Sequence, residues 1–229
     1  MPKPVAVVTG ASRGIGRAVA LRLSGKFDIV AAARSRAELD SLAREIQANG
    51  GSCRPIVVDI TDPAAVASEL AGIEAEVLVN NAGIGVMKPF LELTRADWTR
   101  MVDTNFNALF DVTRAIAPGM VARRSGHIVI VGSISGRSAY IGGTCYAATK
   151  HAVAGFAESL MLEMREHNVK VSVINPGSVD TAFSSGGDGS WKLTAEDVAE
   201  SVAFVVNTPP TVLLHSVEVR TLTVPKKKS

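Results

Sequence analysis

The chain has 229 residues, of which 47% are hydrophobic and 20% charged, so it is long enough to bury a full core as one domain spanning residues 1–229. Its formal net charge of +2, carried by scattered cations, argues against a nucleic-acid partner, which would require a concentrated basic face. The apolar run near the N-terminus is too short for a signal peptide or a membrane span, so we expect a cytoplasmic protein without membrane contacts. Two cysteines far apart, without a Cys/His cluster, indicate neither a disulfide scaffold nor a metal site.

Seven short runs rich in valine, isoleucine and alanine alternate with segments of helical length. Their apolar character is continuous rather than alternating, which is typical of strands buried on both faces of a parallel sheet. The pattern therefore predicts an α/β fold, a parallel β-sheet flanked by helices on both faces. The predicted strands begin at Val5, Asp28, Arg54, Glu76, His127, Val169 and Ser216.

Capping signals mark several helix boundaries. Asp62 before Pro63 predicts an N-cap with proline in the first turn, and Gly50 is expected to end the helix over residues 37–49. Two further pairs resemble capping boxes in which aspartate replaces glutamate, namely Thr94 with Asp97 and Thr194 with Asp197.

Two segments read as irregular. The glycine- and serine-rich residues 184–191 predict a mobile surface loop. The basic tail, residues 224–229, is expected to be a solvated end.

The first predicted strand runs directly into a turn that holds Gly10, Gly14 and Gly16, and an apolar-periodic helix follows. A backbone without Cβ atoms lets a pyrophosphate approach closely, and a helix N-terminus offers it free amides and positive partial charge. The alternative is a tight turn without a ligand. With Thr9 in front, the spacing Thr-Gly-x-x-x-Gly-x-Gly resembles the signature of the short-chain dehydrogenase/reductase family.

The resemblance continues along nearly the whole chain. It includes NNAG at residues 80–83, Asn105 in DTNFNALF, Ser133 after the HIVIVG strand, YAATK at residues 146–150 and NPGSVDT at residues 175–181. All of these motifs in order are highly specific. They imply a Rossmann-like, doubly wound sheet and reversible hydride transfer between a nicotinamide and a small carbonyl or alcohol substrate.

The resemblance also implies where the cofactor lies. Asp59 would contact the adenine edge, or would simply end its strand at a turn. Residues 81–83 would lie along the adenosine. The nicotinamide end would meet Pro176, Gly177, Val179 and Thr181. The full set of expected cofactor-binding residues is Gly10, Ser12, Arg13, Gly14, Ile15, Gly16, Arg34, Ser35, Asp59, Ile60, Asn81, Ala82, Gly83, Tyr146, Lys150, Pro176, Gly177, Val179 and Thr181.

The end of the second predicted strand bears on cofactor choice. A carboxylate there would bind the adenosine ribose hydroxyls of NAD and repel a 2'-phosphate, but this chain has Ala33, then Arg34 and Ser35. Arg13 in the glycine turn could join Arg34 in a fork for phosphate oxygens. We therefore expect NADP(H) in preference to NAD(H), the alternative being that both arginines merely face solvent.

Both tyrosines of the chain lie in one short segment, at Tyr140 and Tyr146. If a helix begins near Tyr146, Lys150 lies one turn further on the same face, whereas Tyr140 is followed by glycines and lacks such a partner. Lowering the phenol pKa from about 10 by roughly three units takes about 4 kcal/mol, which a neighbouring cation can supply. Tyr146 is therefore the candidate general acid, tuned by Lys150, and Tyr140 is expected to shape the substrate side of the pocket.

Two more residues complete the expected catalytic group. Ser133 is expected to lie beside Tyr146 and to donate to the substrate oxygen, and the order of the family motif favours it over the nearby Ser135. Asn105, a poor helix former, could bend its helix and hold water in a proton relay behind Lys150, or it could be a kink asparagine without catalytic duty. No metal is expected, because Ser133 and Tyr146 take the place of a Lewis acid.

The chain departs from the family in two places. Only a short segment separates Thr181 from Thr194, where relatives often carry a helical lid, so we expect an open active site. The short C-terminal end favours a homodimer through the helices around residues 95–120 and 147–167, with a homotetramer as the alternative. Arg123 and Arg124 could form a docking patch for a carrier protein, or they could simply be solvated.

Three functions follow from these observations. The favoured one is an NADPH-dependent ketone or aldehyde reductase, with 3-oxoacyl compounds among its candidate substrates. The second is an NADP-dependent alcohol dehydrogenase that works oxidatively, since the same residues serve both directions. The third is a non-catalytic NADPH-binding regulator, whose usual mark would be the loss of Tyr146 or Lys150.

Overall fold

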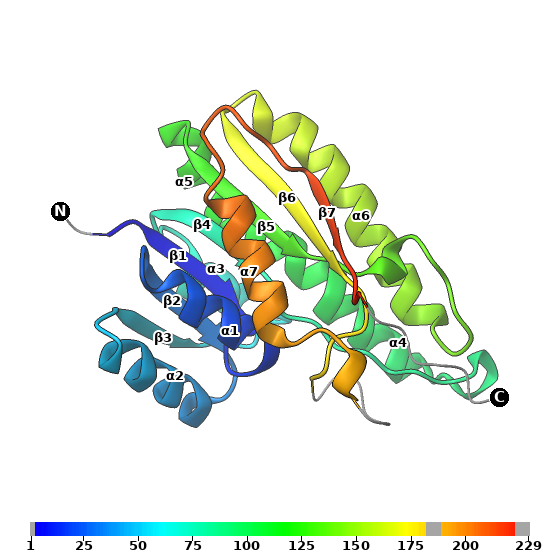
Figure 1. Ribbon diagram of the computed structural model, residues 1–229. Helices are drawn as coiled ribbons and strands as arrows, with labels where there is room; N and C mark the ends of the chain where they lie inside the picture. Colours follow the sequence, from blue (N-terminus) through cyan, green and yellow to red (C-terminus); the bar gives the residue numbers. More distant parts are fainter. Residues whose placement is uncertain (1–2, 182–188, 223–229) are drawn as a thin grey trace.

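A computed structural model describes residues 3–181 and 189–222 of the 229-residue chain (Figure 1). Its centre is a seven-stranded sheet with the order β3-β2-β1-β4-β5-β6-β7, in which every neighbouring pair is parallel. The strands are β1 Val5–Thr9, β2 Asp28–Ala33, β3 Cys53–Val57, β4 Ala75–Asn80, β5 Gly126–Val131, β6 Val169–Pro176 and β7 Ser216–Val219. The predicted parallel α/β sheet is confirmed.

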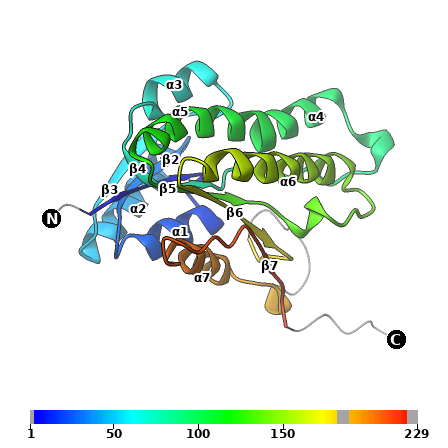
Figure 2. The same cartoon turned by 90° about the horizontal axis from the view of Figure 1, so that it is seen from above.

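Helices cover both faces of this sheet (Figure 2). One face carries α1 Gly14–Leu23, α2 Arg36–Ala48 and α7 Ala195–Val206; the other carries α3 Pro63–Leu70, α4 Arg95–Val102, α5 Ala108–Arg123 and α6 Thr144–Arg165. Side chains alternate along each strand, so Ala6 and Val8 of β1 belong to the core under α1 and α7, whereas Val7 belongs to the core under α5. Two separate cores therefore hold the doubly wound sheet.

The strand order reverses direction between β1 and β4. The chain builds outward from β1 to β3 and then crosses back to place β4 on the other side of β1. In open parallel sheets, ligands bind at the carboxyl ends of the strands beside such a switch point. The segments that follow Thr9 and Asn80 meet at this edge of the sheet.

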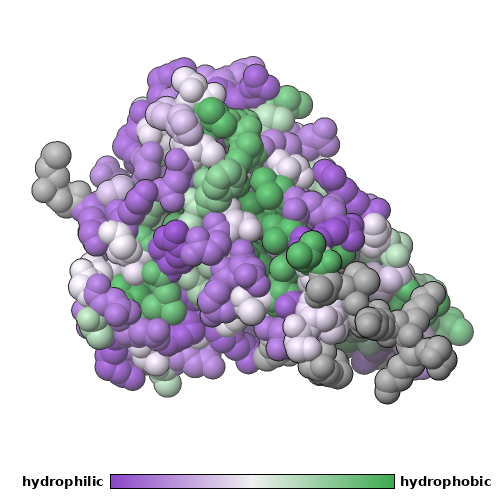
Figure 3. Space-filling model, viewed as in Figure 1, coloured by the Kyte–Doolittle hydropathy of each residue, from purple (hydrophilic) through white to green (hydrophobic). Residues whose placement is uncertain are grey.

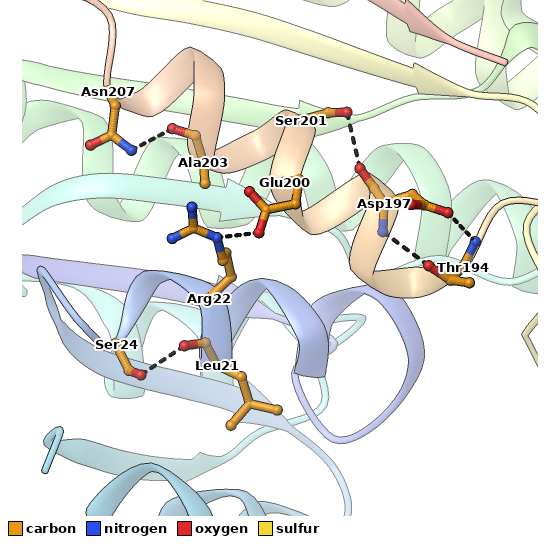
Figure 4. A network of polar contacts seen from close by, with 9 residues as sticks. All are labelled: Leu21, Arg22, Ser24, Thr194, Asp197, Glu200, Ser201, Ala203 and Asn207. Carbon is orange, nitrogen blue, oxygen red and sulfur yellow. Dashed lines mark hydrogen bonds and ion pairs between the residues drawn. The ribbon is translucent and has the colours of Figure 1, made fainter. Parts of the chain in front are cut away.

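Helix α7, late in the chain, packs against α1, early in the chain (Figure 4). The expected capping box is present: Thr194 Oγ1 accepts from Asp197 N at 3.1 Å, and Asp197 Oδ2 accepts from Thr194 N at 2.8 Å. An ion pair between Arg22 and Glu200 joins the two helices, but both side chains are largely exposed, so it adds little stability. The apolar contact between the helices is what holds them.

Other predicted boundaries are also found. The Asp62 side chain accepts from the first amides of α3, Thr94 and Asp97 form a capping box at α4, and Gly50 follows α2 with a φ of 75°. The helix with Tyr146 begins at Thr144, two residues earlier than expected, so the tyrosine lies in its first turn.

The predicted loop over residues 184–191 is described only in part. Gly189–Trp191 forms a turn of 3-10 helix, and Val179 and Leu193 on either side pair in an isolated parallel bridge. Residues 184–188 and the tail 224–229 lie outside the described residues.

Candidate active site

The glycine turn after β1 has the geometry of an anion cradle. Gly10 and Gly14 have φ values of 64° and 55°, and a Cβ on Gly16 would lie 2.3 Å from the Gly10 carbonyl oxygen. Helix α1 begins after Arg13, with no side-chain cap and no acidic residue in its first turn. Its N-terminal amides and partial positive charge therefore face the turn, as a bound pyrophosphate requires.

Thr9 fixes the turns after β1 and β4 against each other. Its hydroxyl accepts from Asn81 N at 3.1 Å and from Ala82 N at 3.2 Å, and it donates to the Val79 carbonyl. The Asn81 side chain donates back to the Thr9 carbonyl at 3.0 Å. Asn81 and Ala82, predicted along the adenosine, thus line the switch point beside the glycine turn.

The predicted phosphate-binding side lies next to this turn, since Ala11 N donates to the Ala32 carbonyl in β2. Arg34 is 75% exposed, and its Nη1 lies 3.9 Å from Asp59 Oδ2. Ser35 is the N-cap of α2 and makes no side-chain capping bond, so a second helix start is open here. Arg13 is exposed. Both predicted arginines are therefore accessible to a phosphate group.

Asp59 behaves as the turn-forming alternative predicts. Its Oδ1 accepts from the amide of Thr61 at 3.0 Å and from its hydroxyl at 2.8 Å, and these bonds lower the pKa of Asp59. The carboxylate is nevertheless about half exposed at the carboxyl end of β3. The adenine contact stays a prediction.

The remaining predicted cofactor residues lie near the same carboxyl edge of the sheet. Gly177 N, after β6, donates to the Val219 carbonyl at 2.8 Å. A Cβ on Gly14 would lie 3.7 Å from Thr181 Cγ2, which brings the segment after β6 over the glycine turn. The half-buried residues Ser12, Ile15, Ile60, Gly177 and Thr181 all border this edge, and Gly83 approaches the Asn105 side chain.

Tyr146 and Ser133 meet at the carboxyl end of β5. Tyr146, in the first turn of α6, is 9% exposed, and Ser133 follows β5 as the N-cap of a short 3-10 turn. Burial raises the pKa of Tyr146 to about 12, and a hydrogen bond with Ser133 partly opposes that shift. The Ser133 amide donates to Asn175 Oδ1 at 3.3 Å, which ties the serine to β6.

Lys150 lies one helical turn beyond Tyr146, as predicted, but its amine has a different partner. Nζ donates to the Val131 carbonyl at 3.0 Å and lies 5.8 Å from the centre of the Tyr146 ring. Burial lowers the pKa of Lys150 to about 8. Desolvation dominates the pKa of the phenol in this structure, and the expectation that Lys150 lowers the pKa of Tyr146 stays a prediction.

Asn105 lies in a π-helical turn, Asp103–Asn107, that joins α4 to α5, so the expected disruption of its helix is found. Its Oδ1 accepts from Ile84 N at 2.8 Å, and its Nδ2 donates to Ile84 O at 2.9 Å and to Thr149 Oγ1 at 3.1 Å. Thr149 Oγ1 in turn donates to the Tyr146 carbonyl at 2.8 Å. Both amide protons of Asn105 are thus used in clamping the loop after β4 to α6.

A small cavity of about 10 Å³ lies behind Lys150. Its polar lining residues are Thr9, Asn80, Thr104, Asn105 and Lys150. A space of this size and polarity suits about one water molecule.

The second tyrosine is close to the first. The Tyr140 hydroxyl donates to Met87 Sδ at 3.0 Å, and Tyr140 is 43% exposed. Burial raises the pKa of Tyr140, and a hydrogen bond with Ser135 opposes that shift. Ser135, the competitor of Ser133 in the sequence, thus pairs with Tyr140.

Sequence reasoning missed Thr149 and Met87. Both act through side-chain contacts between segments far apart in the chain, and neither residue type carries a chemical signal. Arg123 and Arg124, predicted to be a docking patch or solvated, are both exposed, and each also donates to a backbone carbonyl, of Ala75 and Glu166 respectively.

Within residues 3–181 and 189–222, no group of three or more His, Cys, Asp or Glu side chains could hold a metal ion. No helix in the same part of the chain is long and apolar enough to cross a membrane.

Comparison with known proteins agrees with this geometry. The family model described as short chain dehydrogenase matches residues 4–187. The NADP-dependent 3-hydroxy acid dehydrogenase of Escherichia coli (strain K12) is 35% identical over 239 aligned residues, covering 96% of this chain and 95% of that protein. A 3-oxoacyl-[acyl-carrier-protein] reductase of Salmonella typhimurium is 34% identical, covering 77% and 74%.

A solved structure gives the same result. The crystal structure of a metagenomic short-chain oxidoreductase in complex with NADP matches with a TM-score of 0.87 at 33% identity, covering 97% of this chain and 99% of that chain. The chain therefore belongs to the short-chain dehydrogenase/reductase family.

Proposed function

We propose that this protein is an NADPH-dependent reductase of ketones or aldehydes, with 3-oxoacyl compounds among its substrates and Tyr146 as the general acid. One observation carries the proposal. The buried phenol of Tyr146 is hydrogen-bonded with Ser133 at the carboxyl edge of the sheet, beside a glycine turn with open amides. A dinucleotide in the turn and a carbonyl at the two hydroxyls would share one crevice.

The residues present fit a dinucleotide. The backbone of the turn from Gly10 to Gly16 would hold the pyrophosphate, and Arg34, Arg13 and Ser35 would hold a 2'-phosphate. Arg34 would exchange its long contact with Asp59 for the phosphate. The relative named NADP-dependent and the solved neighbour with bound NADP support NADP(H) as the cofactor.

Each catalytic side chain has a defined task. When bound, NADPH supplies the hydride that the carbonyl carbon receives. The Ser133 hydroxyl donates to the carbonyl oxygen and stabilises the negative charge that develops there. Tyr146 gives its proton to the same oxygen, and a pKa of about 12 keeps the phenol protonated and ready at neutral pH.

Lys150 and the cavity behind it restore the proton. Because the pKa of Lys150 is lowered to about 8, the amine can release a proton close to physiological pH. A water molecule in the cavity lined by Asn105 and Lys150 would hydrogen-bond to the amine and serve as its proton source. Asn105 supports this relay by holding the loop and the helix that enclose it.

The same groups serve oxidation of an alcohol, and the name of the Escherichia coli relative favours that alternative. The name of the Salmonella relative favours reduction of a 3-oxoacyl compound. A non-catalytic regulator would not require the buried Tyr146, Ser133 and Lys150 to be kept together. A direct screen decides among the three functions.

The screen measures NADPH oxidation with ketones, aldehydes and 3-oxoacyl thioesters, and NADP⁺ reduction with the matching alcohols. We expect turnover of at least one carbonyl class. Binding of NADPH without turnover in either direction would instead establish the regulator.

The cofactor assignment has its own test. Arg34→Asp places a carboxylate where the 2'-phosphate would bind, so kcat/KM for NADPH should fall by about 100-fold or more while that for NADH falls little. Steady-state kinetics with both cofactors measure this. An NADH preference in the unmodified enzyme, or an unchanged ratio in the variant, would overturn the NADP(H) assignment.

We further propose an oligomer with an open active site and a substrate side shaped by Tyr140. The expected dimer face on α5 and α6 carries the half-exposed hydrophobic side chains Phe110 and Leu162. A band of hydrophobic side chains also crosses the face of α7 and β7 (Figure 3), where Phe204 is 66% exposed. Two apolar faces support a homotetramer as well as a homodimer, which sedimentation can resolve.

A further inference from the structure

Thr149 lies directly before Lys150 in α6, and its hydroxyl joins two parts of the site. Thr149 is 3% exposed. Its Oγ1 donates to the Tyr146 carbonyl at 2.8 Å and accepts from Asn105 Nδ2 at 3.1 Å. A bond from a helical threonine to the carbonyl one turn earlier is common, but the second bond comes from the π-helical turn of another segment. The hydroxyl therefore connects the backbone of Tyr146 to Asn105.

Asn105 extends this connection to the loop after β4. Its Oδ1 accepts from Ile84 N at 2.8 Å and its Nδ2 donates to Ile84 O at 2.9 Å, so one side chain pairs both backbone polar groups of Ile84. The Ile84 side chain packs against the apolar cluster that contains Tyr146. A continuous series of hydrogen bonds therefore runs from Ile84 through Asn105 and Thr149 to the Tyr146 backbone.

The Thr149 hydroxyl fixes the orientation of the Asn105 amide. An asparagine side chain has two N–H donors, and those of Asn105 bond to Ile84 and to Thr149. Asn105 is only 4% exposed. Without the hydroxyl, a buried N–H would lose its acceptor, which is costly enough to make the amide turn or shift toward another partner. The loop at Ile84 would then lose its anchor as well.

The first turn of α6 is thus held at two adjacent residues. Lys150 Nζ donates to the Val131 carbonyl of β5 at 3.0 Å, and Thr149 bonds to the π-helical turn. Together these contacts hold the turn that carries Tyr146 against both the sheet and the loop after β4. Proton transfer is sensitive to such placement, since a displacement of about 1 Å can lower a rate by about 100-fold.

We propose that Thr149 is a positioning residue of the active site. Its hydroxyl holds Tyr146 in place for proton transfer and couples that placement to the loop at Ile84. Because Thr149 is 3% exposed, it acts through Tyr146 and Asn105 and not by touching the substrate. This inference rests on the proposed reductase function and adds a residue to its machinery.

The kinetic test uses two substitutions of Thr149. Thr149→Val keeps the branched shape and removes the hydroxyl, whereas Thr149→Ser keeps the hydroxyl. With NADPH and the carbonyl compound that the unmodified enzyme reduces fastest, kcat should fall about 10- to 100-fold in the valine variant. The KM for NADPH should stay within about twofold, because the glycine turn is untouched, and the serine variant should keep about half of kcat or more.

A matched control separates positioning from a general loss of stability. Thr113 of α5 accepts from Asn80 Nδ2 at 3.0 Å, and these residues are 4% and 7% exposed. Thr113→Val therefore also breaks a buried bond between an amide and a hydroxyl. It should lower Tm as Thr149→Val does, but it should leave kcat within about twofold of the unmodified enzyme.

Hydrogen exchange follows the coupling without any turnover. The Ile84 amide is bonded to Asn105 Oδ1, so its exchange should become about tenfold faster or more in Thr149→Val, where Asn105 is no longer held. Exchange at Ile84 should be unchanged in Thr149→Ser and in Thr113→Val. Nuclear magnetic resonance, or mass spectrometry of the peptide that contains Ile84, measures it.

The outcomes separate the two proposals. Unchanged kcat or unchanged exchange at Ile84 in Thr149→Val, or an equal loss of kcat in Thr113→Val, would overturn the positioning role while leaving the reductase function intact. No turnover of any carbonyl by the unmodified enzyme would overturn the function itself, and hydrogen exchange would then still decide whether Thr149 holds the loop at Ile84.

Discussion

The two tyrosines of the chain carry the same phenol in different surroundings. Tyr146 is 9% exposed and stands next to the buried amine of Lys150, whereas Tyr140 is 43% exposed and contacts Met87. Burial raises the pKa of both phenols, and more strongly for Tyr146. The difference in burial, rather than in residue type, separates a proton donor from a hydrogen-bonding group.

Local backbone structure produces this difference. Tyr146 is in the first turn of α6 and belongs to a small apolar cluster with Met101 and Cys145, so it is largely buried. Tyr140 precedes Gly142, which has a φ of 80°, and the backbone of Gly143 lies on its ring: a Cβ there would be 2.5 Å from Cζ. The glycine pair therefore folds Tyr140 back along the rim.

The strongest way to test the comparison is to remove the hydroxyl of Tyr146. Tyr146→Phe should lower kcat for ketone reduction by about 10³- to 10⁴-fold, the usual contribution of a general acid, with little change in the affinity for NADPH. Stopped-flow or steady-state assays measure the first quantity and fluorescence titration the second. If the variant kept more than about a tenth of the activity, Tyr140 or water would be the proton donor instead.

Motifs in the sequence predicted most of the site because their residues are local. The glycine turn, the Tyr146–Lys150 spacing and the continuous apolar strands each depend on neighbours within one or two turns of chain, and each was found as predicted. The direction of the Tyr146 pKa was not predictable. It depends on how many apolar atoms surround the phenol and on the Val131 carbonyl that binds Lys150, which only the fold brings together.

The hydrogen bonds between distant segments could not be predicted from the sequence either. Asn105 was predicted to disturb its helix, but its bonds to Ile84 and Thr149 join residues 21 and 44 positions away. Contacts between side chains that are far apart in the sequence produce no residue spacing from which they could be predicted.

The pH dependence of the two directions gives a smaller effect, about tenfold per pH unit. Reduction needs the protonated phenol, and with a Tyr146 pKa of about 12 this form persists, so Tyr146 should cause no loss of kcat/KM between about pH 6 and 9. Oxidation needs the phenolate, whose fraction rises tenfold per unit while the pH is below the pKa. The rate of alcohol oxidation should therefore climb with pH over the same range.

A different profile would break the comparison in an informative way. If reduction declined with a midpoint near pH 7, the bound cofactor and Lys150 would have lowered the pKa of Tyr146, as the sequence alone suggests.

The smallest expected effect concerns Met87, whose sulfur accepts a hydrogen bond from the Tyr140 hydroxyl. Met87→Leu keeps the size and apolar character of the side chain but removes the sulfur acceptor. Because the hydroxyl would then lack a competing partner, kcat/KM for a 3-oxo ester should rise by up to about threefold relative to that for 2-hexanone. A fall in that ratio would mean that the sulfur holds Tyr140 in its binding position, so that the contact orients the phenol instead of competing with the substrate.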